Sequence, residues 1–333
     1  MTITLGPHKL GPPVFLAPMA GITDLPFRRL VARFGAGLVV SEMVASEEMM
    51  QGLPEMRARA LLDNAELGLA EAATSVQIAG RDVYWMAEAA RALEGQGARI
   101  IDINMGCPAK RVTTGACGAA LMREPDRALK LIEAVVGAVR IPVTLKMRLG
   151  WDRDCLNAPE LAKAAEGAGV AMVTVHGRTR NQLYKGQADW AAIRAVKDAV
   201  SIPVIANGDI VDAATARRAL DLSGADGVMV GRGAQGAPWV LAEIAHELHG
   251  APAPKVPVGR DLAALVIEHY EAALGFYGRE LGLRCVRKHL NWYLSRSGDP
   301  VLRPRILVES DPARVVALLS EAFDGSYAES VAA

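Results

Sequence analysis

The sequence predicts an α/β protein in which a (β/α)8 barrel, the TIM-barrel architecture, is followed by a small all-helical C-terminal domain. Short apolar runs rich in Val and Ile alternate eight times with amphipathic stretches. Each run is mostly apolar before it ends in polar or Gly residues, as expected of parallel strands that are covered on both faces. Eight such units over about 250 residues match the usual length of this barrel. An open doubly wound sheet is the alternative, but it would not normally need eight alternating units.

The predicted strands, in chain order, are residues 14–20, 38–44, 74–79, 100–105, 143–148, 172–176, 204–207 and 227–230. Helical periodicity between and after them predicts helices over residues 24–34, 83–94, 126–139, 159–168, 190–200, 213–222 and 238–248.

The pattern changes after residue 249. Residues 250–259 read GAPAPKVPVG, a Pro-rich stretch that is typical of a linker. Beyond it, residues 260–277, 281–294 and 312–323 have helical periodicity without strand-like runs. We therefore expect a barrel domain over 1–249, a linker over 250–259 and a helical domain over 260–333.

Composition excludes several classes of protein. With 51% hydrophobic and 22% charged residues, the 333-residue chain has the make-up of a soluble globular protein. We expect no membrane helix and no secretory signal, and hence a cytoplasmic address. The four cysteines include no CxxC pair, so we expect free thiols and no metal site. Net charge is zero, yet residues 279–305 hold seven basic and two acidic residues, a local patch suited to a polyanion.

Polar residues gather where the predicted strands end, and the carboxyl ends of barrel strands are where active sites lie. For any single residue, ordinary solvation or an internal ion pair is an equally good explanation, but eight strands ending in this way favour a site. The candidates are Pro18, Met19, Glu42, Gln77, Asn104, Cys107, Lys146, Arg148, His176, Arg178, Asn207, Asp209, Gly231 and Arg232.

The last two strand ends have the features of a phosphate site. Residues 206–209 (Ala-Asn-Gly-Asp) and 231–233 (Gly-Arg-Gly) supply small residues whose backbone N–H groups can bind an anion. Glycines 231, 233 and 236 also spell G-x-G-x-x-G, but no βαβ unit follows, so a Rossmann fold is rejected. A phosphate-bearing cofactor in a barrel suggests FMN. Cys107, on a Gly-rich strand-end loop, could donate a proton beside such a flavin.

Several segments together resemble the bacterial tRNA-dihydrouridine synthases. The matching segments are VFLAPMAGITDLPF (14–27), INMGCPAK (103–110), LKMR (145–148), TVHGRTR (174–180), VIANGDI (204–210) and VMVGRGAQGAPW (228–239). RKHLNWYL (287–294) is similar to the B subgroup of that family.

The resemblance implies an FMN enzyme that reduces selected tRNA uridines, expected in the D-loop, to 5,6-dihydrouridine, with NADPH or NADH as reductant. Hydride would pass from the flavin to uracil C6 while Cys107 protonates C5. Asn104, Arg148 and Arg178 would face the substrate. The implied flavin contacts are Pro18, Met19, Ala20, Gln77, Lys146 and His176, with Asn207, Gly208, Asp209, Gly231 and Arg232 at the phosphate. Cys117 departs from the family, where a Ser is expected, and it places a second thiol on the same loop.

A uridine in folded RNA must be flipped out of its stack to reach the active site of a barrel, so the protein must also bind the RNA around it. Arg284, Arg287 and Lys288 fall on one helix face and are the expected tRNA contacts of the helical domain. We expect a monomer. One rival is a small-molecule flavin enzyme of the dihydropyrimidine or dihydroorotate type, and another is a non-catalytic tRNA-binding module that keeps its flavin for structure.

Overall fold

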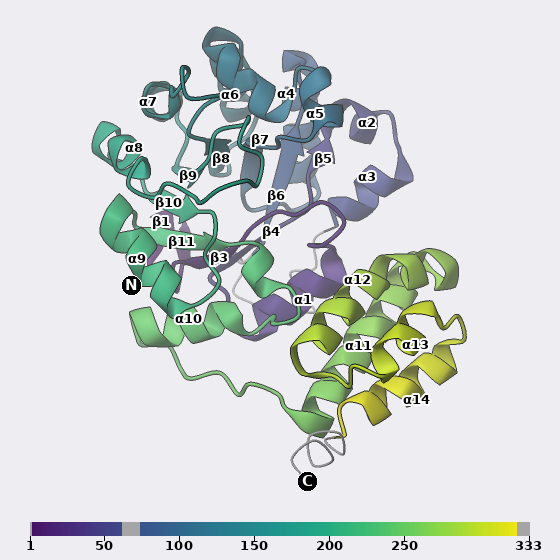
Figure 1. The fold of residues 1–333 in the computed structure, drawn as a ribbon. Coiled ribbons are helices and arrows are strands. Elements are labelled where there is room, and N and C mark those ends of the chain that lie inside the picture. Colours follow the sequence, from purple (N-terminus) through teal and green to yellow (C-terminus); the bar gives the residue numbers. More distant parts are fainter. Residues whose placement is uncertain (1, 62–73, 325–333) are drawn as a thin grey trace. The chain divides into compact units, whose positions relative to one another are not determined.

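A computed structural model describes residues 2–61 and 74–324 of the chain. Its central feature is a closed parallel barrel, with helices around it (Figure 1). Within the described residues, nine parallel strand segments form the sheet, and β4 also pairs with β6, which closes the ring. The barrel strands are β3 (Val14–Leu16), β4 (Leu38–Val40), β5 (Val44–Ala45), β6 (Thr74–Ala79), β7 (Ile101–Met105), β8 (Val143–Arg148), β9 (Met172–His176), β10 (Val204–Asn207) and β11 (Gly227–Val230). The predicted (β/α)8 class is confirmed.

The second predicted strand, over 38–44, is interrupted. It forms β4 and β5, which both pair with β6 but in separate places, Val39 with Thr74 and Val44 with Ile78. Between them the Ser41 hydroxyl accepts a hydrogen bond from the Gln77 N–H at 3.0 Å. A side chain thus takes the place of a ladder carbonyl, and an apolar sequence run cannot reveal such a break.

The helices around the barrel lie close to their predicted positions. They are α1 (Leu25–Arg33), α4 (Val83–Gly95), α6 (Pro125–Ala138), α7 (Ala158–Gly167), α8 (Ile193–Ala199), α9 (Ala213–Ser223) and α10 (Val240–His249). Aspartates cap three of them: the side chains of Asp24, Asp82 and Asp212 accept N–H groups of the first turn. Five short elements were not predicted, because each is too brief to show a period: α2 (Ser46–Met50), α3 (Pro54–Arg59), α5 (Lys110–Thr114), η1 (Gly118–Arg123) and η2 (Arg232–Ala234).

A hairpin precedes the barrel, formed by β1 (Ile3–Leu5) and β2 (His8–Leu10). Gly6 lies in its turn with φ +55°. Ile3, Leu5 and Leu10 are buried in one cluster with strand residues such as Phe15, Met172 and Ile205. The hairpin therefore fills part of the barrel interior and leaves the carboxyl ends of the strands for polar residues.

The chain divides into two compact units, 1–233 with 240–252, and 234–239 with 253–333. The second unit contains α11 (Gly259–Tyr277), α12 (Arg279–Ser297), α13 (Leu302–Val308) and α14 (Pro312–Ala322). The α13 helix was not predicted, since it is short and contains Pro304. Tyr270, Tyr293, His269 and His289 are buried between these helices. Within the described ranges, no helix has both the length and the apolar character needed to cross a bilayer.

Candidate active site

The barrel register brings the predicted polar residues of four neighbouring strands together. Asn104 pairs with Lys146, Arg148 with His176, and His176 with Asn207. Each of these residues stands at or near the carboxyl end of its strand, so their side chains share one end of the barrel.

Cys107 is held by a chain of buried hydrogen bonds that begins inside the barrel. The Thr144 hydroxyl donates to Asp102 Oδ1 at 2.6 Å, and Gln77 Nε2 donates to Asp102 Oδ2 at 2.6 Å. Asn104 Nδ2 donates to Gln77 Oε1 at 2.7 Å. The backbone N–H groups of Gly106 and Cys107 then donate to Asn104 Oδ1 at 3.2 and 2.9 Å. Asn104 therefore fixes the backbone at Cys107.

The Cys107 loop, residues 106–123, folds back on the cysteine. Ala119 N–H donates to the Cys107 carbonyl at 3.0 Å. Gly118 has φ +57°, and a Cβ there would lie 2.9 Å from that carbonyl, so only glycine fits without strain. The packing leaves Cys107 partly exposed.

Cys117 has different surroundings on the same loop. Its Sγ donates to the Gly115 carbonyl at 3.3 Å, and burial raises the pKa of its thiol despite the nearby charges of Arg81 and Arg127. A thiol that is hydrogen-bonded within its own loop and resists ionisation is suited to packing. Of the two, Cys107 is the thiol at the strand end.

Asn207 links Lys146 and His176. Its Nδ2 donates to the Met229 carbonyl at 2.8 Å, which fixes the orientation of the amide. Oδ1 therefore accepts, from Lys146 Nζ at 3.0 Å and from His176 Nδ1–H at 3.0 Å. His176 Nε2 is then free of a proton and accepts from Arg178 Nη1 at 3.3 Å. The imidazole is neutral and protonated on Nδ1.

Burial and like charges weaken the cations of the site. Burial and the neighbouring Arg148 charge lower the pKa of Lys146 to about 8, against the opposing pull of Asp102 and Cys107. Burial also lowers the pKa of Arg148 to about 10. Burial and the charges of Lys146, Arg148 and Arg178 hold the pKa of His176 well below its usual value. An electron-rich ligand bound here would offset the repulsion between these positive charges.

Arg148 is 2% exposed and joins two loops. Its Nε donates to the Gly106 carbonyl at 2.7 Å, and Nη1 donates to the carbonyls of Thr179 and Leu183 at 2.9 and 3.0 Å. The carbonyl contact at Gly106 positions the Cys107 loop. The guanidinium also lies 5.7 Å from the ring centre of Tyr184.

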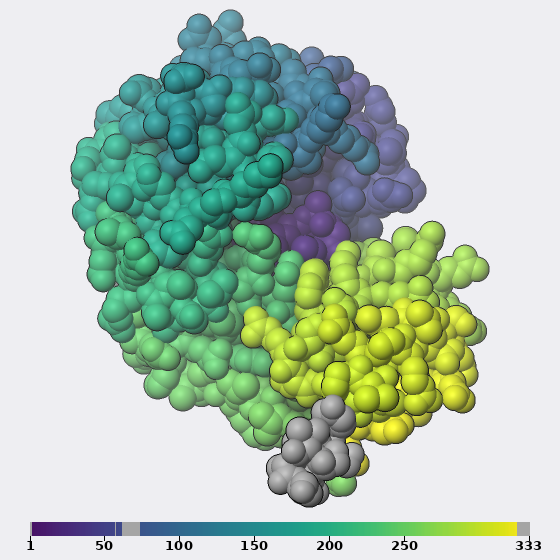
Figure 2. Space-filling view, in the orientation of Figure 1, coloured from purple at the N-terminus to yellow at the C-terminus, as the bar shows by residue number. Residues whose placement is uncertain are grey.

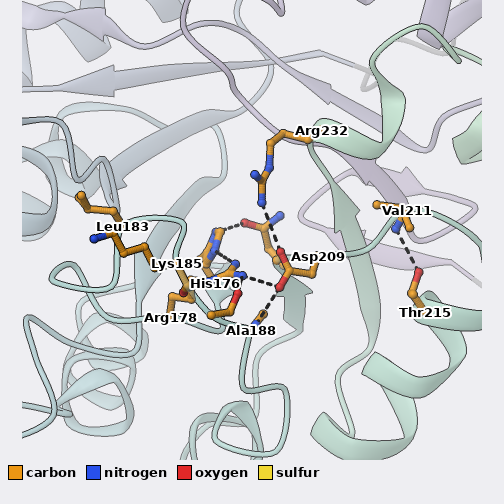
Figure 3. Close-up of polar contacts among 12 residues, drawn as sticks. His176, Arg178, Leu183, Lys185, Ala188, Asp209, Val211, Thr215 and Arg232 are labelled. Carbon is orange, nitrogen blue, oxygen red and sulfur yellow. Dashed lines mark hydrogen bonds and ion pairs between the residues drawn. The ribbon is translucent and has the colours of Figure 1, made fainter. Parts of the chain in front are cut away.

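Asp209 lies between two arginines at the predicted phosphate site (Figure 3). Its Oδ2 accepts from Arg178 Nη2 at 2.5 Å and from Ala188 N–H at 2.8 Å, and its Oδ1 pairs with Arg232 Nη2 at 3.3 Å. Burial favours the neutral carboxyl, but these hydrogen bonds and charges lower the pKa of Asp209. Asp209 has φ +54°, so its backbone turns sharply after β10. Arg232, which is exposed, reaches Asp209 from the end of β11.

Arg178 is surrounded by protein groups. The residue is 1% exposed. Besides His176 and Asp209, its guanidinium donates to the carbonyls of Lys185 and Gly186 at 3.1 and 2.7 Å. Arg178 thus orders the loop after β9 and fixes the tautomer of His176.

Sequence reasoning missed three residues of this region. Asp102 accepts from Gln77 inside the barrel, and Thr144 donates to Asp102. Asp102 carried a usable signal, because a charged residue two positions before Asn104 in an apolar strand faces the same way. Tyr184 is 57% exposed and its ring centre lies 5.2 Å from the Arg232 guanidinium. Nothing in the loop sequence indicated this placement.

The basic residues predicted to contact RNA lie in the second unit, on α12. Arg284 is exposed and Lys288 is half-buried. Arg287 is half-buried, and its Nη2 donates to the Glu309 carbonyl at 3.3 Å, just after α13 ends. Arg287 therefore contributes to the packing of the helices, whereas Arg284 is open to solvent.

Comparison with known proteins shows the family. The Dihydrouridine synthase (Dus) family model matches residues 15–324. A "Probable tRNA-dihydrouridine synthase" of Rhodobacter capsulatus is 65% identical over 323 residues, covering 97% of this chain and 98% of that one. A "tRNA-dihydrouridine synthase B" of Pseudomonas aeruginosa is 47% identical over 294 residues, with 88% and 87% coverage.

Solved structures share the fold at low identity. A histamine dehydrogenase from Rhizobium superposes with a TM-score of 0.57 at 12% identity, over 81% of this chain and 50% of that one. This likeness reports the barrel alone. The expected resemblance to the B subgroup is confirmed by the relatives, and the chain belongs to the dihydrouridine synthase family.

Proposed function

We propose that this protein reduces uridines of tRNA to 5,6-dihydrouridine, using FMN that is reduced by NADPH or NADH. The observation that carries the proposal is the placement of Cys107. A partly exposed thiol is fixed through Asn104 at the same barrel end as Lys146, Arg148 and His176. This is the arrangement expected of a proton donor beside a flavin.

The donor groups of the site fit FMN. Exposed Arg232 and the backbone N–H groups around Gly208 and Gly231 offer a cation and small-residue turns for a phosphate. A Cβ added to Gly231 would lie 3.6 Å from Met19 Sδ, which is an ordinary van der Waals contact. The end of β11 therefore lies close to residues 18–20. Lys146 supplies positive charge for the electron-rich end of an isoalloxazine, with Pro18, Met19, Ala20 and His176 around it.

Three predicted cofactor residues take indirect roles in this proposal. Gln77 is fully buried and holds Asn104. The amide of Asn207 is occupied by Lys146, His176 and Met229, so it orients the first two. The Asp209 carboxylate is occupied by arginines and would repel a phosphate, which leaves its backbone N–H as the useful group.

The bound flavin supplies the hydride equivalent that reaches uracil C6. The residues of the chain do the rest. Cys107 donates its thiol proton to C5, and Asn104 keeps the Cys107 backbone in place. The neutral, Nδ1-protonated His176 has one acceptor, Nε2, to which Arg178 donates, so an N–H group of the cofactor or the base would have to share or replace that contact. Arg148 orients the loops on both sides of the reacting thiol.

The tRNA partner needs contacts beyond one flipped base. Arg284 and Lys288 of α12 are the proposed phosphate contacts of the helical unit, and Arg287 supports them by bracing α13. The enzyme should act as a monomer with no metal. The experiment is to incubate FMN-loaded protein and NADPH with an unmodified tRNA transcript and to measure dihydrouridine by nucleoside mass spectrometry. A protein that acts on free uracil or on dihydroorotate, and not on tRNA, would contradict the proposal.

A further inference from the structure

Two neighbouring loops of the barrel carry basic residues that the site does not use. The Cys107 loop, residues 106–123, contains Lys110, Arg111 and Arg123 and no acidic residue. The loop after β9, residues 177–188, contains Arg178, Arg180 and Lys185 and again no acidic residue. Arg178 is buried, whereas Lys110, Arg111, Arg123 and Lys185 are exposed and Arg180 is half-buried. We call Lys110, Arg111, Arg123, Arg180 and Lys185 the basic rim.

The two loops are joined into one surface. Arg180 Nη2 donates to the Thr113 hydroxyl of α5 at 3.2 Å. The guanidinium carbons of Arg123 and Arg180 lie 4.0 and 4.6 Å from the ring centre of Trp151, which follows β8. Figure 2 shows these segments, blue-green to teal, as a continuous surface over the barrel. Lys110 and Arg111 of this surface follow Cys107 by three and four residues on the same loop.

Two cations of the rim lie close together. Two guanidinium groups share one indole ring, and neighbouring cations repel each other. Over residues 2–61 and 74–324, none of the five rim residues forms an ion pair with a carboxylate. Asp152, beside Trp151, instead accepts a hydrogen bond from Asp154 N–H at 3.1 Å. Unneutralised cations around a reaction site are expected where a polyanion binds.

Trp151 prepares the arginines for such a partner. A long Arg side chain loses rotamer entropy when it is ordered. Stacking on the indole orders Arg123 and Arg180 beforehand, so less is lost on binding. The flat guanidinium keeps N–H edges that suit a phosphate.

The helical unit offers fewer open cations than its charge suggests. Arg279 donates to the Ser310 carbonyl at 3.4 Å, Arg287 to the Glu309 carbonyl at 3.3 Å, and Arg303 to Asn291 Oδ1 at 2.7 Å. These side chains are held within that unit. A second RNA contact on the barrel would complement the remaining ones.

We propose that the basic rim binds the sugar–phosphate backbone next to the uridine that enters the site. This inference rests on the proposed function, since it assigns a surface to the same tRNA. The rim keeps the flanking nucleotides in place while the target base is out of its stack. In that state the RNA has lost stacking and pairing contacts of its own.

The test compares two double variants with equal loss of charge. Lys110→Ala/Arg111→Ala removes two rim cations. Lys130→Ala/Arg217→Ala removes two exposed cations from α6 and α9 and serves as the control. The dissociation constant of unmodified tRNA is measured on FMN-loaded protein, without NADPH, between about 50 and 200 mM KCl.

If two phosphate contacts are lost, the slope of log K against log salt falls by about 1.4 to 1.8 in the rim variant and stays unchanged in the control. Adding Arg123→Gln to the rim variant should lower the slope of log K against log salt by about a further 0.7 to 0.9. Trp151→Leu should weaken binding several-fold with an unchanged slope, since every charge remains. Reduction of flavin by NADPH should not change in the rim double variant.

Equal slopes and affinities in the rim variant and the control would overturn the proposal, as would equal losses in both, which would mean that overall charge alone decides. Wild-type protein tested in parallel separates this failure from that of the proposed function. Absence of dihydrouridine from wild-type reactions rejects the function. If the wild type forms dihydrouridine normally and the rim variant binds tRNA as the control does, only the proposed RNA-binding surface is rejected.

Discussion

Replacing Lys146 by Met should stabilise the fold while it disables the site. The ammonium group lies near Arg148 and a neutral His176, and burial together with the Arg148 charge lowers its pKa from 10.5 to about 8, against the opposing pull of Asp102 and Cys107. At about 1.4 kcal/mol for each pKa unit, keeping Lys146 charged at pH 7 costs up to about 3 kcal/mol of folding free energy. Because the side chain is only half-buried, we expect a gain of about 1 to 3 kcal/mol from Lys146→Met.

The sign of the pH dependence follows from the lowered pKa. Below about pH 8 the folded and unfolded chains both carry the proton, and the full penalty is present. Between about pH 8 and 10.5 the unfolded chain keeps a proton that the folded chain has released, so wild-type stability rises with pH relative to the variant. The advantage of Lys146→Met should therefore shrink from pH 7 to pH 9.5.

The assay is urea unfolding of flavin-free protein at pH 7 and pH 9.5, with Lys130→Met as the control at an exposed position on α6. The control should lie within about 0.5 kcal/mol of wild type. The reasoning is refuted if Lys146→Met is the less stable protein at pH 7, or if its difference from wild type is the same at both pH values.

Three further predictions address the cofactor, the histidine and the helical unit. Arg232→Ala should weaken FMN binding by about 10- to 150-fold, since a charged hydrogen bond contributes about 1.5 to 3 kcal/mol, and flavin fluorescence titration checks this against Arg217→Ala. In Arg178→Met, histidine 15N spectra should lose the single Nδ1-protonated form of His176 that the wild type shows; an unchanged spectrum would mean that Asn207 alone sets the tautomer. Burial lowers the pKa of His269 to about 3, so its neutral form stabilises the helices at neutral pH and this stability is lost as pH falls below about 6.5. His269→Phe should remove about 2 kcal/mol of the loss between pH 7 and pH 5, and equal acid sensitivity in both proteins would contradict this.

The barrel could be predicted because its signal is repeated and long-ranged. Each strand is a mostly apolar run and each helix has its own period, so an error in one unit does not disturb the assignment of the others. The break between β4 and β5 escaped because it depends on the Ser41 hydroxyl meeting the Gln77 N–H, a contact between distant positions. The short helix α5 was not predicted, because five residues are too few to show a helical period.

The site could be predicted as a set of positions but not as a set of contacts. Strand ends pointed to Asn104, Lys146, His176 and Asn207, and the register brings them together. Which side chains face solvent and which hold their neighbours depends on packing. The sequence indicated Arg178 as a site residue, but it could not indicate that the side chain is buried and donates to four acceptors of the protein.

The two thiols of the Cys107 loop give the most direct test of the central claim. Wild type, Cys107→Ala and Cys117→Ala are each expressed in a strain that lacks its own dihydrouridine synthases, and the tRNA is analysed by nucleoside mass spectrometry. Loss of the proton donor should lower dihydrouridine formation by about 10²- to 10⁴-fold in Cys107→Ala, with flavin content and NADPH-driven flavin reduction intact. Cys117→Ala should remain near wild type. Normal dihydrouridine in Cys107→Ala, or its loss in Cys117→Ala alone, would contradict the account.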